Sequence, residues 1–167
     1  MRNTITQYLS NVGSGTDKAA LSALLQVIAS RLNTVATATA GLVIKAGGGV
    51  LAKTGAAAFR GTVGGRAVTI AAGVDMPALT GLVITANKFN VACFFIAAAG
   101  TVTVAFGTEG GTAAAVVFPD FPIDKALVGF LLITHSSTFT GNTTALDTAT
   151  TVYHSPVGAF DPTILFN

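Results

Sequence analysis

The feature that most constrains the fold is a single stretch of helical periodicity, residues 17–39, followed by a long region that has none. Five apolar residues recur there at steps of four, three, four and three, the spacing of a coiled-coil seam. They are Leu21, Leu25, Ile28, Leu32 and Val35. The spacing predicts one helix from Asp17 to Thr39. A helix of this length is marginal in water by itself, so the seam needs a partner. Two partners are open: other copies of the helix in a short parallel bundle, or the β region of the same chain.

From Leu42 onward, glycine recurs every few residues between short runs of Val, Ile, Phe and Thr. Short runs bounded by Gly and Asn turns are typical of antiparallel all-β folds. The expected strands are Leu42–Lys45, Val50–Lys53, Ala67–Ala72, Leu79–Thr85, Asn90–Ala98, Thr101–Phe106, Ala113–Phe118, Ala126–Thr134 and Thr148–His154. The pattern predicts a mainly β fold: an antiparallel β-sandwich or jelly-roll-like body with one N-terminal α-helix.

Glycine spacing also suggests how the chain is divided. Residues 46–65 hold seven glycines, and we expect them to extend over a neighbouring molecule rather than pack in their own core. The expected organisation is an N-terminal segment and helix (1–41), a Gly-rich arm (42–66) and a β-sandwich body (67–167). Between strands, Phe118-Pro-Asp-Phe-Pro122 predicts a corner with its two phenylalanines tucked beneath it, because proline cannot donate to a ladder.

Composition favours assembly over a free monomer. Charged residues make up only 10% of the chain, against about 25% in ordinary proteins, and 51% of residues are hydrophobic. The few charges are distributed unevenly: residues 1–74 carry seven cations and one acid, whereas residues 75–167 carry two cations and six acids. Such halves suit contacts between neighbouring subunits or with an acidic partner.

Four cations in the arm form the candidate partner-contact surface: Lys45, Lys53, Arg60 and Arg66. Phe59 is the only aromatic residue among them, so the sequence offers no stacking platform for a specific nucleic-acid site. An acidic protein neighbour accounts for the cations equally well.

The uncharged stretch Phe89–Thr108 is long enough for a membrane helix. However, Gly100 interrupts it, and Thr101–Phe106 alternates with period two, so we expect a β-hairpin turning near Ala99 and Gly100, and no membrane contact. Cys93 lies in an apolar run typical of a core cysteine. The N-terminus lacks an apolar secretory region, so we expect the protein to reach its place by assembly in the cytoplasm.

Three motifs approach known chemistry and fall short. Gly47–Thr54 resembles a phosphate-binding loop, but Ala52 replaces its second glycine and no helix is expected at Lys53. His135 and His154 with nearby serines lack a nucleophile elbow, and with Cys93 they lack zinc-site spacing. The sequence therefore predicts no enzyme activity, no catalytic residue, no cofactor and no metal.

One region resembles a known group of proteins. Residues 121–133 contain Ala-Leu-Val-Gly-Phe-Leu-Leu-Ile, residues 137–147 read Ser-Thr-Phe-Thr-Gly-Asn-Thr-Thr-Ala-Leu-Asp, and Thr151-Val-Tyr follows. This succession of a strand, an F-T-G-x-T-T-x-L-D loop and a final strand resembles tailed-bacteriophage virion proteins. The resemblance implies a structural component of the particle, of the capsid-decoration or head-fibre type, in trimers, with no catalytic residues.

The expected function is therefore a non-enzymatic protein that decorates or cements a phage capsid through subunit contacts. Its partners would be the major capsid protein or other virion proteins and further copies of itself, and its location the virion, assembled in the bacterial host cytoplasm. The alternative is a tail- or fibre-associated module that binds a host glycan.

Overall fold

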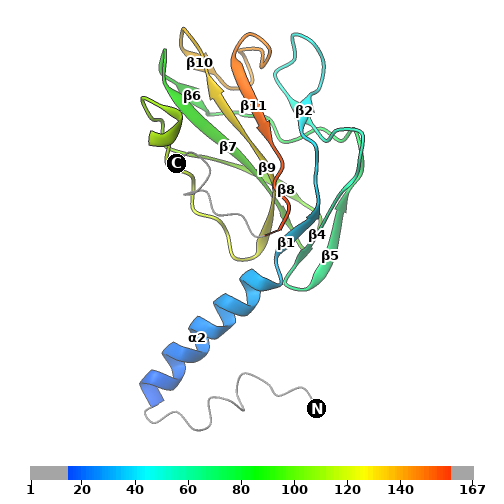
Figure 1. The fold of residues 1–167 in the computed structure, drawn as a ribbon, viewed down its shortest axis with the longest axis vertical. Coiled ribbons are helices and arrows are strands. Elements are labelled where there is room, and N and C mark those ends of the chain that lie inside the picture. Colours follow the sequence, from blue (N-terminus) through cyan, green and yellow to red (C-terminus); the bar gives the residue numbers. More distant parts are fainter. Residues whose placement is uncertain (1–14, 159–167) are drawn as a thin grey trace.

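The computed structural model describes residues 15–158, and these form one long helix and a β body (Figure 1). The helix, α2, covers Gly15–Leu32. The strands are β1 (Val35–Ala38), β2 (Val43–Ile44), β3 (Ala52–Lys53), β4 (Phe59–Val63), β5 (Arg66–Ile70), β6 (Val83–Ile84), β7 (Phe89–Ala97), β8 (Val102–Phe106), β9 (Lys125–Thr134), β10 (Phe139–Thr140) and β11 (Thr150–His154). Every strand pairing is antiparallel. The prediction of a mainly β fold with one helix is confirmed.

The central sheet has the strand order β11-β9-β7-β8. Strands β7 and β9 pair from Phe89 opposite Thr134 to Ala97 opposite Lys125. Residues 90–96 of β7 are all buried, which means that both faces of this strand are covered. A strand covered on both faces favours apolar residues on both, so from Val91 to Ile96 its sequence reads as a continuous apolar run rather than an alternation. The buried Asn90 accepts a hydrogen bond from Val91 N through its Oδ1.

The same run shows why the uncharged stretch is not a membrane helix. Strands β7 and β8 form a hairpin, with Ile96 opposite Val102 and a turn in which Gly100 has φ of 85°. The predicted hairpin is confirmed. Within residues 15–158, no helix is long and apolar enough to cross a membrane.

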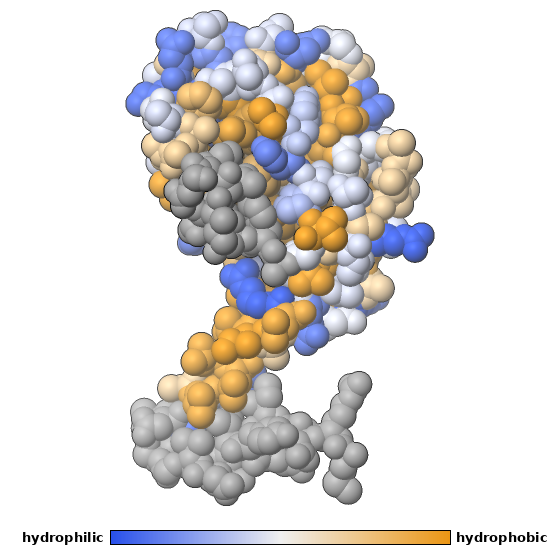
Figure 2. Space-filling view, in the orientation of Figure 1, coloured by the Kyte–Doolittle hydropathy of each residue, from blue (hydrophilic) through white to orange (hydrophobic). Residues whose placement is uncertain are grey.

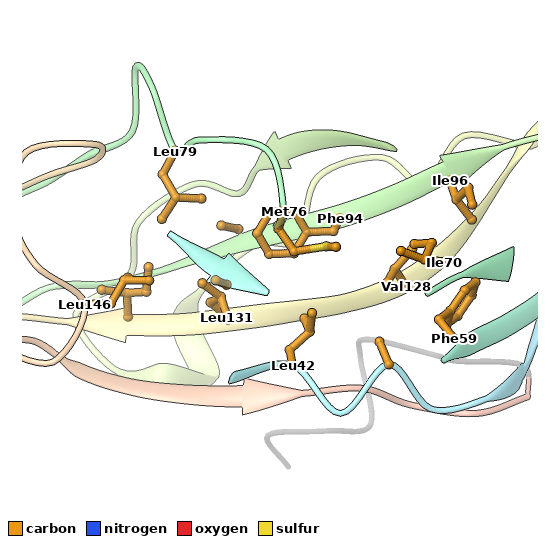
Figure 3. Close-up of a cluster of buried hydrophobic side chains, with 14 of the residues drawn as sticks. Leu42, Phe59, Ile70, Met76, Leu79, Phe94, Ile96, Val128, Leu131 and Leu146 are labelled. Carbon is orange, nitrogen blue, oxygen red and sulfur yellow. The ribbon is translucent and has the colours of Figure 1, made fainter. Parts of the chain in front are cut away.

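A second sheet, of order β1-β4-β5, packs over one face of the central sheet. Figure 3 shows Phe59 of β4 and Ile70 of β5 facing Val128 of β9 and Ile96 of β7. This contact between two antiparallel sheets is the larger core, and it makes the body sandwich-like.

The opposite face of the central sheet carries a smaller core around Cys93, Phe95 and Phe130. The predicted corner covers it: the rings of Phe118 and Phe121 pack edge to face, with centroids 6.2 Å apart. The corner is confirmed. The strand expected just before it is wrong, because residues 113–115 form a short 3-10 helix and only Val117 makes a bridge, to Thr108.

The helix ends earlier than the seam spacing predicted. Leu32 is its last residue, and Val35–Ala38 is strand β1, paired with β4. Val35 therefore does not belong to the helical seam. Thr34, Val35 and Thr37 are β-branched residues of low helix propensity, so pairing with β4 decides the conformation here.

The expectation of an arm over residues 42–66 is also wrong. This segment holds β2, β3 and β4, and Leu42, Ala52 and Phe59 are buried in the larger core. Glycine here permits close packing: a Cβ at Gly61 would lie 2.8 Å from the Val35 carbonyl oxygen. High glycine content predicted an extended segment because glycine has no side chain. A glycine on the buried face of a strand therefore interrupts the apolar–polar alternation by which that strand could be predicted.

Gly141, in the loop after β10, lies very close to the backbone of Leu79. A Cβ there would lie 1.9 Å from the backbone oxygen of Leu79. We expect Gly141→Ala to lower the free energy of unfolding by about 1–3 kcal/mol or more, because backbone must move to admit the methyl group. Urea denaturation followed by circular dichroism measures this change.

The matched control is Gly111→Ala, since nothing lies within 4 Å of a Cβ at Gly111 and its φ is not positive. Equal stability of the two variants would contradict the close approach of Gly141 to Leu79.

Candidate interaction surfaces

Helix α2 projects from one end of the β body and does not lie along either sheet (Figure 1). Two side-chain hydrogen bonds join its last turn to the corner before β9. Ser30 Oγ donates to the carbonyl oxygen of Ile123 at 2.9 Å, and Arg31 Nη2 donates to that of Phe121 at 2.6 Å. The helix is thus fixed at its C-terminal end, and the remainder extends beyond the body.

The projecting part of α2 exposes a broad apolar surface. Leu32 is 73% exposed, Leu24 56%, Ile28 44% and Val27 40%. Figure 2 shows this helix as a nearly continuous hydrophobic stretch below the body. Covering one such side chain is worth about 1.5–3 kcal/mol, so the bare helix is an unfavourable free state. Of the predicted seam, Leu21, Leu25, Ile28 and Leu32 lie on α2, whereas Val35 does not.

A cavity of about 240 Å³ lies where α2 meets the body. Phe95, Phe121 and Leu127 supply apolar walls, and Arg31 and Lys125 bring cations to it. The Arg31 guanidinium is committed to the Phe121 carbonyl, and Lys125 Nζ donates to Thr103 Oγ1 at 3.2 Å. Sequence reasoning missed this joining role of Arg31. Its place in the last turn of the helix, where basic residues favour the helix dipole, was the available signal.

The four cations of the expected partner-contact surface do not gather. Lys45 forms an ion pair with Asp75, with Nζ and Oδ2 2.5 Å apart, and Lys53 forms a bridge with the same Asp75 through the backbone. Arg60 and Arg66 are exposed on a different sheet, on β4 and β5. Arg60 and Arg66 lie on one hairpin, but the alternation of the strands puts them on opposite faces of it.

The residues that carry the virion-protein resemblance form one structural unit. They make up β9, β10 with its loop, and β11, and the loop aspartate reaches across to the glycine-rich turn between β2 and β3. Asp147 Oδ2 accepts a hydrogen bond from Gly48 N at 2.6 Å, and Leu146 N donates to Gly49 O at 2.9 Å. The loop is therefore joined to the turn between β2 and β3 by two hydrogen bonds.

The two histidines are separated by their local contacts. His135 Nδ1 accepts from the backbone N–H of Ser137 at 3.1 Å and lies 2.9 Å from Ser137 Oγ, a contact between residues two apart in one turn. His154 instead stacks on Phe130, with ring centroids 4.6 Å apart. Among residues 18–158, no group of three His, Cys, Asp or Glu side chains is close enough to hold a metal ion. Burial raises the pKa of the Cys93 thiol, which disfavours a reactive thiolate there.

Comparisons of the chain with models of protein families, with curated proteins and with solved structures give no match.

The stacked histidine predicts a pH dependence of stability. Burial lowers the pKa of His154 below its ordinary value of 6.5, so the folded state favours the neutral ring. As the pH falls below 6.5, the unfolded chain binds a proton that the folded chain resists. The stability contributed by the neutral ring is therefore present above 6.5 and is lost progressively as the pH falls toward the lowered pKa.

His154→Phe keeps a ring against Phe130 but cannot titrate. We expect its melting temperature to decline less than that of the parent protein between about pH 7.5 and pH 5.5. Parallel declines, measured by thermal scans at the two pH values, would show that His154 titrates freely.

Proposed function

We propose that this protein is a non-enzymatic structural subunit of a tailed-phage particle, which decorates or cements the capsid through subunit contacts. The observation that carries the proposal is helix α2, a bare apolar helix fixed at one end to a self-contained β body. A body with a buried core that projects an apolar helix is built to be joined to other subunits. The resemblance of β9, the β10 loop and β11 to virion proteins supports the choice of a phage particle.

The partner that best fits α2 is two further copies of the same helix. The four seam residues on α2 lie within a narrow arc, and Leu24 and Val27 widen this apolar stripe on one side. A wide stripe suits a bundle of three helices better than a pair, because each helix then contacts two neighbours. We therefore propose a homotrimer with its α2 helices parallel and its β bodies at one end.

The major capsid protein or another virion protein is the proposed second partner, and the virion, assembled in the host cytoplasm, the proposed location. Arg60 is exposed on the outer face of the β4–β5 hairpin, which leaves it available to an acidic neighbour, and Arg66 is exposed at the end of the hairpin on the other face. This contact is protein to protein, without specific nucleic-acid recognition.

Replacing two apolar residues of the α2 seam with aspartate tests the trimer. Leu25→Asp with Ile28→Asp places carboxylates in the bundle, where burying unpaired charge is costly, and we expect the trimer to fall to a smaller species. Light scattering coupled to size-exclusion chromatography measures the mass. The β body should keep its melting temperature, since α2 projects from it.

The control variant, Ser22→Asp with Gln26→Asp, adds the same charge to the other side of α2 and should remain trimeric. A parent protein that is monomeric at all concentrations would overturn the role of α2. In purified particles, antibody labelling should place the chain on the capsid, and its absence from particles would overturn the virion role.

A polar cavity favours glycan binding as the second candidate. A hollow of about 270 Å³ lies at the end of the body where β9 finishes and β11 begins, away from α2. Only polar side chains line it: Asn87, Thr134, His135, Ser136, Thr148 and Thr150. Hydroxyl, amide and imidazole groups in one hollow match the hydrogen-bonding groups of a sugar.

Glycan-array binding by the full chain tests this candidate. We expect Thr148→Val to reduce any glycan signal at least tenfold, because it removes a hydroxyl from the hollow and preserves side-chain shape. Unchanged binding by Thr148→Val would show that the glycan does not bind in this hollow. If the parent protein binds no glycan on the array, the glycan-binding candidate fails and only the capsid role remains.

A further inference from the structure

We propose that strand β8 is a second, independent interface, at which two copies of this protein pair their β8 strands antiparallel across a two-fold axis. The interface goes beyond the structural role proposed above, and it does not use α2.

Strand β8 is an edge of the central sheet, with β7 as its one strand neighbour. At the hairpin end, Ala97 N donates to Thr101 O at 3.0 Å, and at the far end Gly107 N donates to Val91 O at 3.0 Å. Since backbone groups of successive residues in a strand point to opposite sides, Thr101, Thr103, Ala105 and Gly107 face β7. The N–H and C=O groups of Val102, Val104 and Phe106 therefore point away from the sheet.

Within residues 15–158, these outward groups have no hydrogen-bond partner in the structure. The residues themselves are only partly exposed, and Val102, Val104 and Phe106 direct their side chains toward the larger core. An unpaired row of backbone groups beside a hydrophobic face is a ready template for another strand.

The edge also lacks the features that usually prevent such pairing. Residues 101–107 contain no charge and no proline, and β8 pairs with β7 without a bulge. The opposite edge of the sheet is different. After β11, the Ser155 carbonyl oxygen accepts from Thr39 Oγ1 at 3.1 Å, and Ser155 Oγ accepts from Leu42 N at 3.0 Å. These contacts tie the residue after β11 to the segment between β1 and β2.

A second copy of β8 fits this edge better than a strand of unrelated sequence, because the register is self-complementary. Centring the axis on Val104 places Val104 opposite its counterpart and Val102 opposite Phe106. A pair of β-branched and aromatic residues is among the favourable cross-strand pairs, and no like charges meet. The side chains on the core side would then continue the hydrophobic layer from one sandwich to the next.

The β8 contact is small. Pairing of two five-residue strands buries less than the roughly 1,200–2,000 Å² of a stable interface, so the β8 contact alone is weak. It becomes effective when another contact, such as the α2 bundle, holds several copies together and raises the local concentration. A trapping experiment is therefore the appropriate test.

The first experiment uses the full chain with Val104→Cys under mild oxidation. Paired β8 strands bring the two new thiols within disulfide range at the two-fold axis. We expect covalent dimers to form at least tenfold faster than for Val152→Cys. Val152 lies on β11 and is 45% exposed, so it reports random collisions at the other edge. Cys93 is buried and is retained in both variants.

The second experiment tests the register. Val102→Cys and Phe106→Cys proteins should cross-link to each other when mixed, and each should cross-link poorly alone, because residue 102 faces residue 106 of the partner. Thermal scans of the reduced variants show whether each one folds.

Equal cross-linking of Val104→Cys and Val152→Cys would overturn the proposal and assign the β8 edge to a different occupant. Adding the α2 substitutions Leu25→Asp and Ile28→Asp should slow the trapping while preserving its preference for residue 104, which separates failure of the α2 contact from failure of the β8 contact.

Discussion

The pairing of β7 with β9 is the interaction on which the rest of the structure depends. It runs from residue 89 to residue 97, and both strands are buried almost throughout. Its side chains alternate between the two cores: Phe94 and Leu131 face the larger, and Phe95 and Phe130 face the smaller. One pairing thus organises two hydrophobic layers. A shift of one residue in its register would send each side chain to the wrong core, so the register is strongly specified.

Close approach of loops to this central pair follows from small residues. A Cβ at Gly129 in β9 would lie 2.5 Å from the His154 carbonyl oxygen and 2.7 Å from Leu42 Cδ1. Glycine there lets β11 and the segment before β2 lie against the central sheet. Asp147 then holds the turn at Gly48. The loop whose residues resemble virion proteins thus contributes contacts that join two parts of the β body.

Sequence alone predicted the elements whose signal is local and missed those decided by distant pairing. The β7–β8 hairpin and the proline corner could be predicted because an apolar run, Gly100 and two prolines carry their own conformational preferences. Strands β1 and β4 were missed because the seam spacing extended by chance to Val35 and because Gly61 interrupts the alternation of β4. Strands β1 and β4 adopt their conformation by pairing with each other, which the local sequence of neither strand shows. The same reasoning applies to the surfaces: the seam on α2 predicted only that the helix needs a partner, whereas the outward groups of β8 depend on which side β7 occupies.

The two proposed contacts use different symmetry, and this has a structural consequence. A bundle of three α2 helices is a closed three-fold contact, and β8 pairing is a closed two-fold contact that shares no residue with it. Each would end in a small oligomer by itself. Together they would link every trimer to three others, because each subunit contributes one free β8 edge. A protein that joins three-fold and two-fold contacts in this way extends across a surface. That property suits a component that cements a shell, and it allows the individual β8 contact to remain weak.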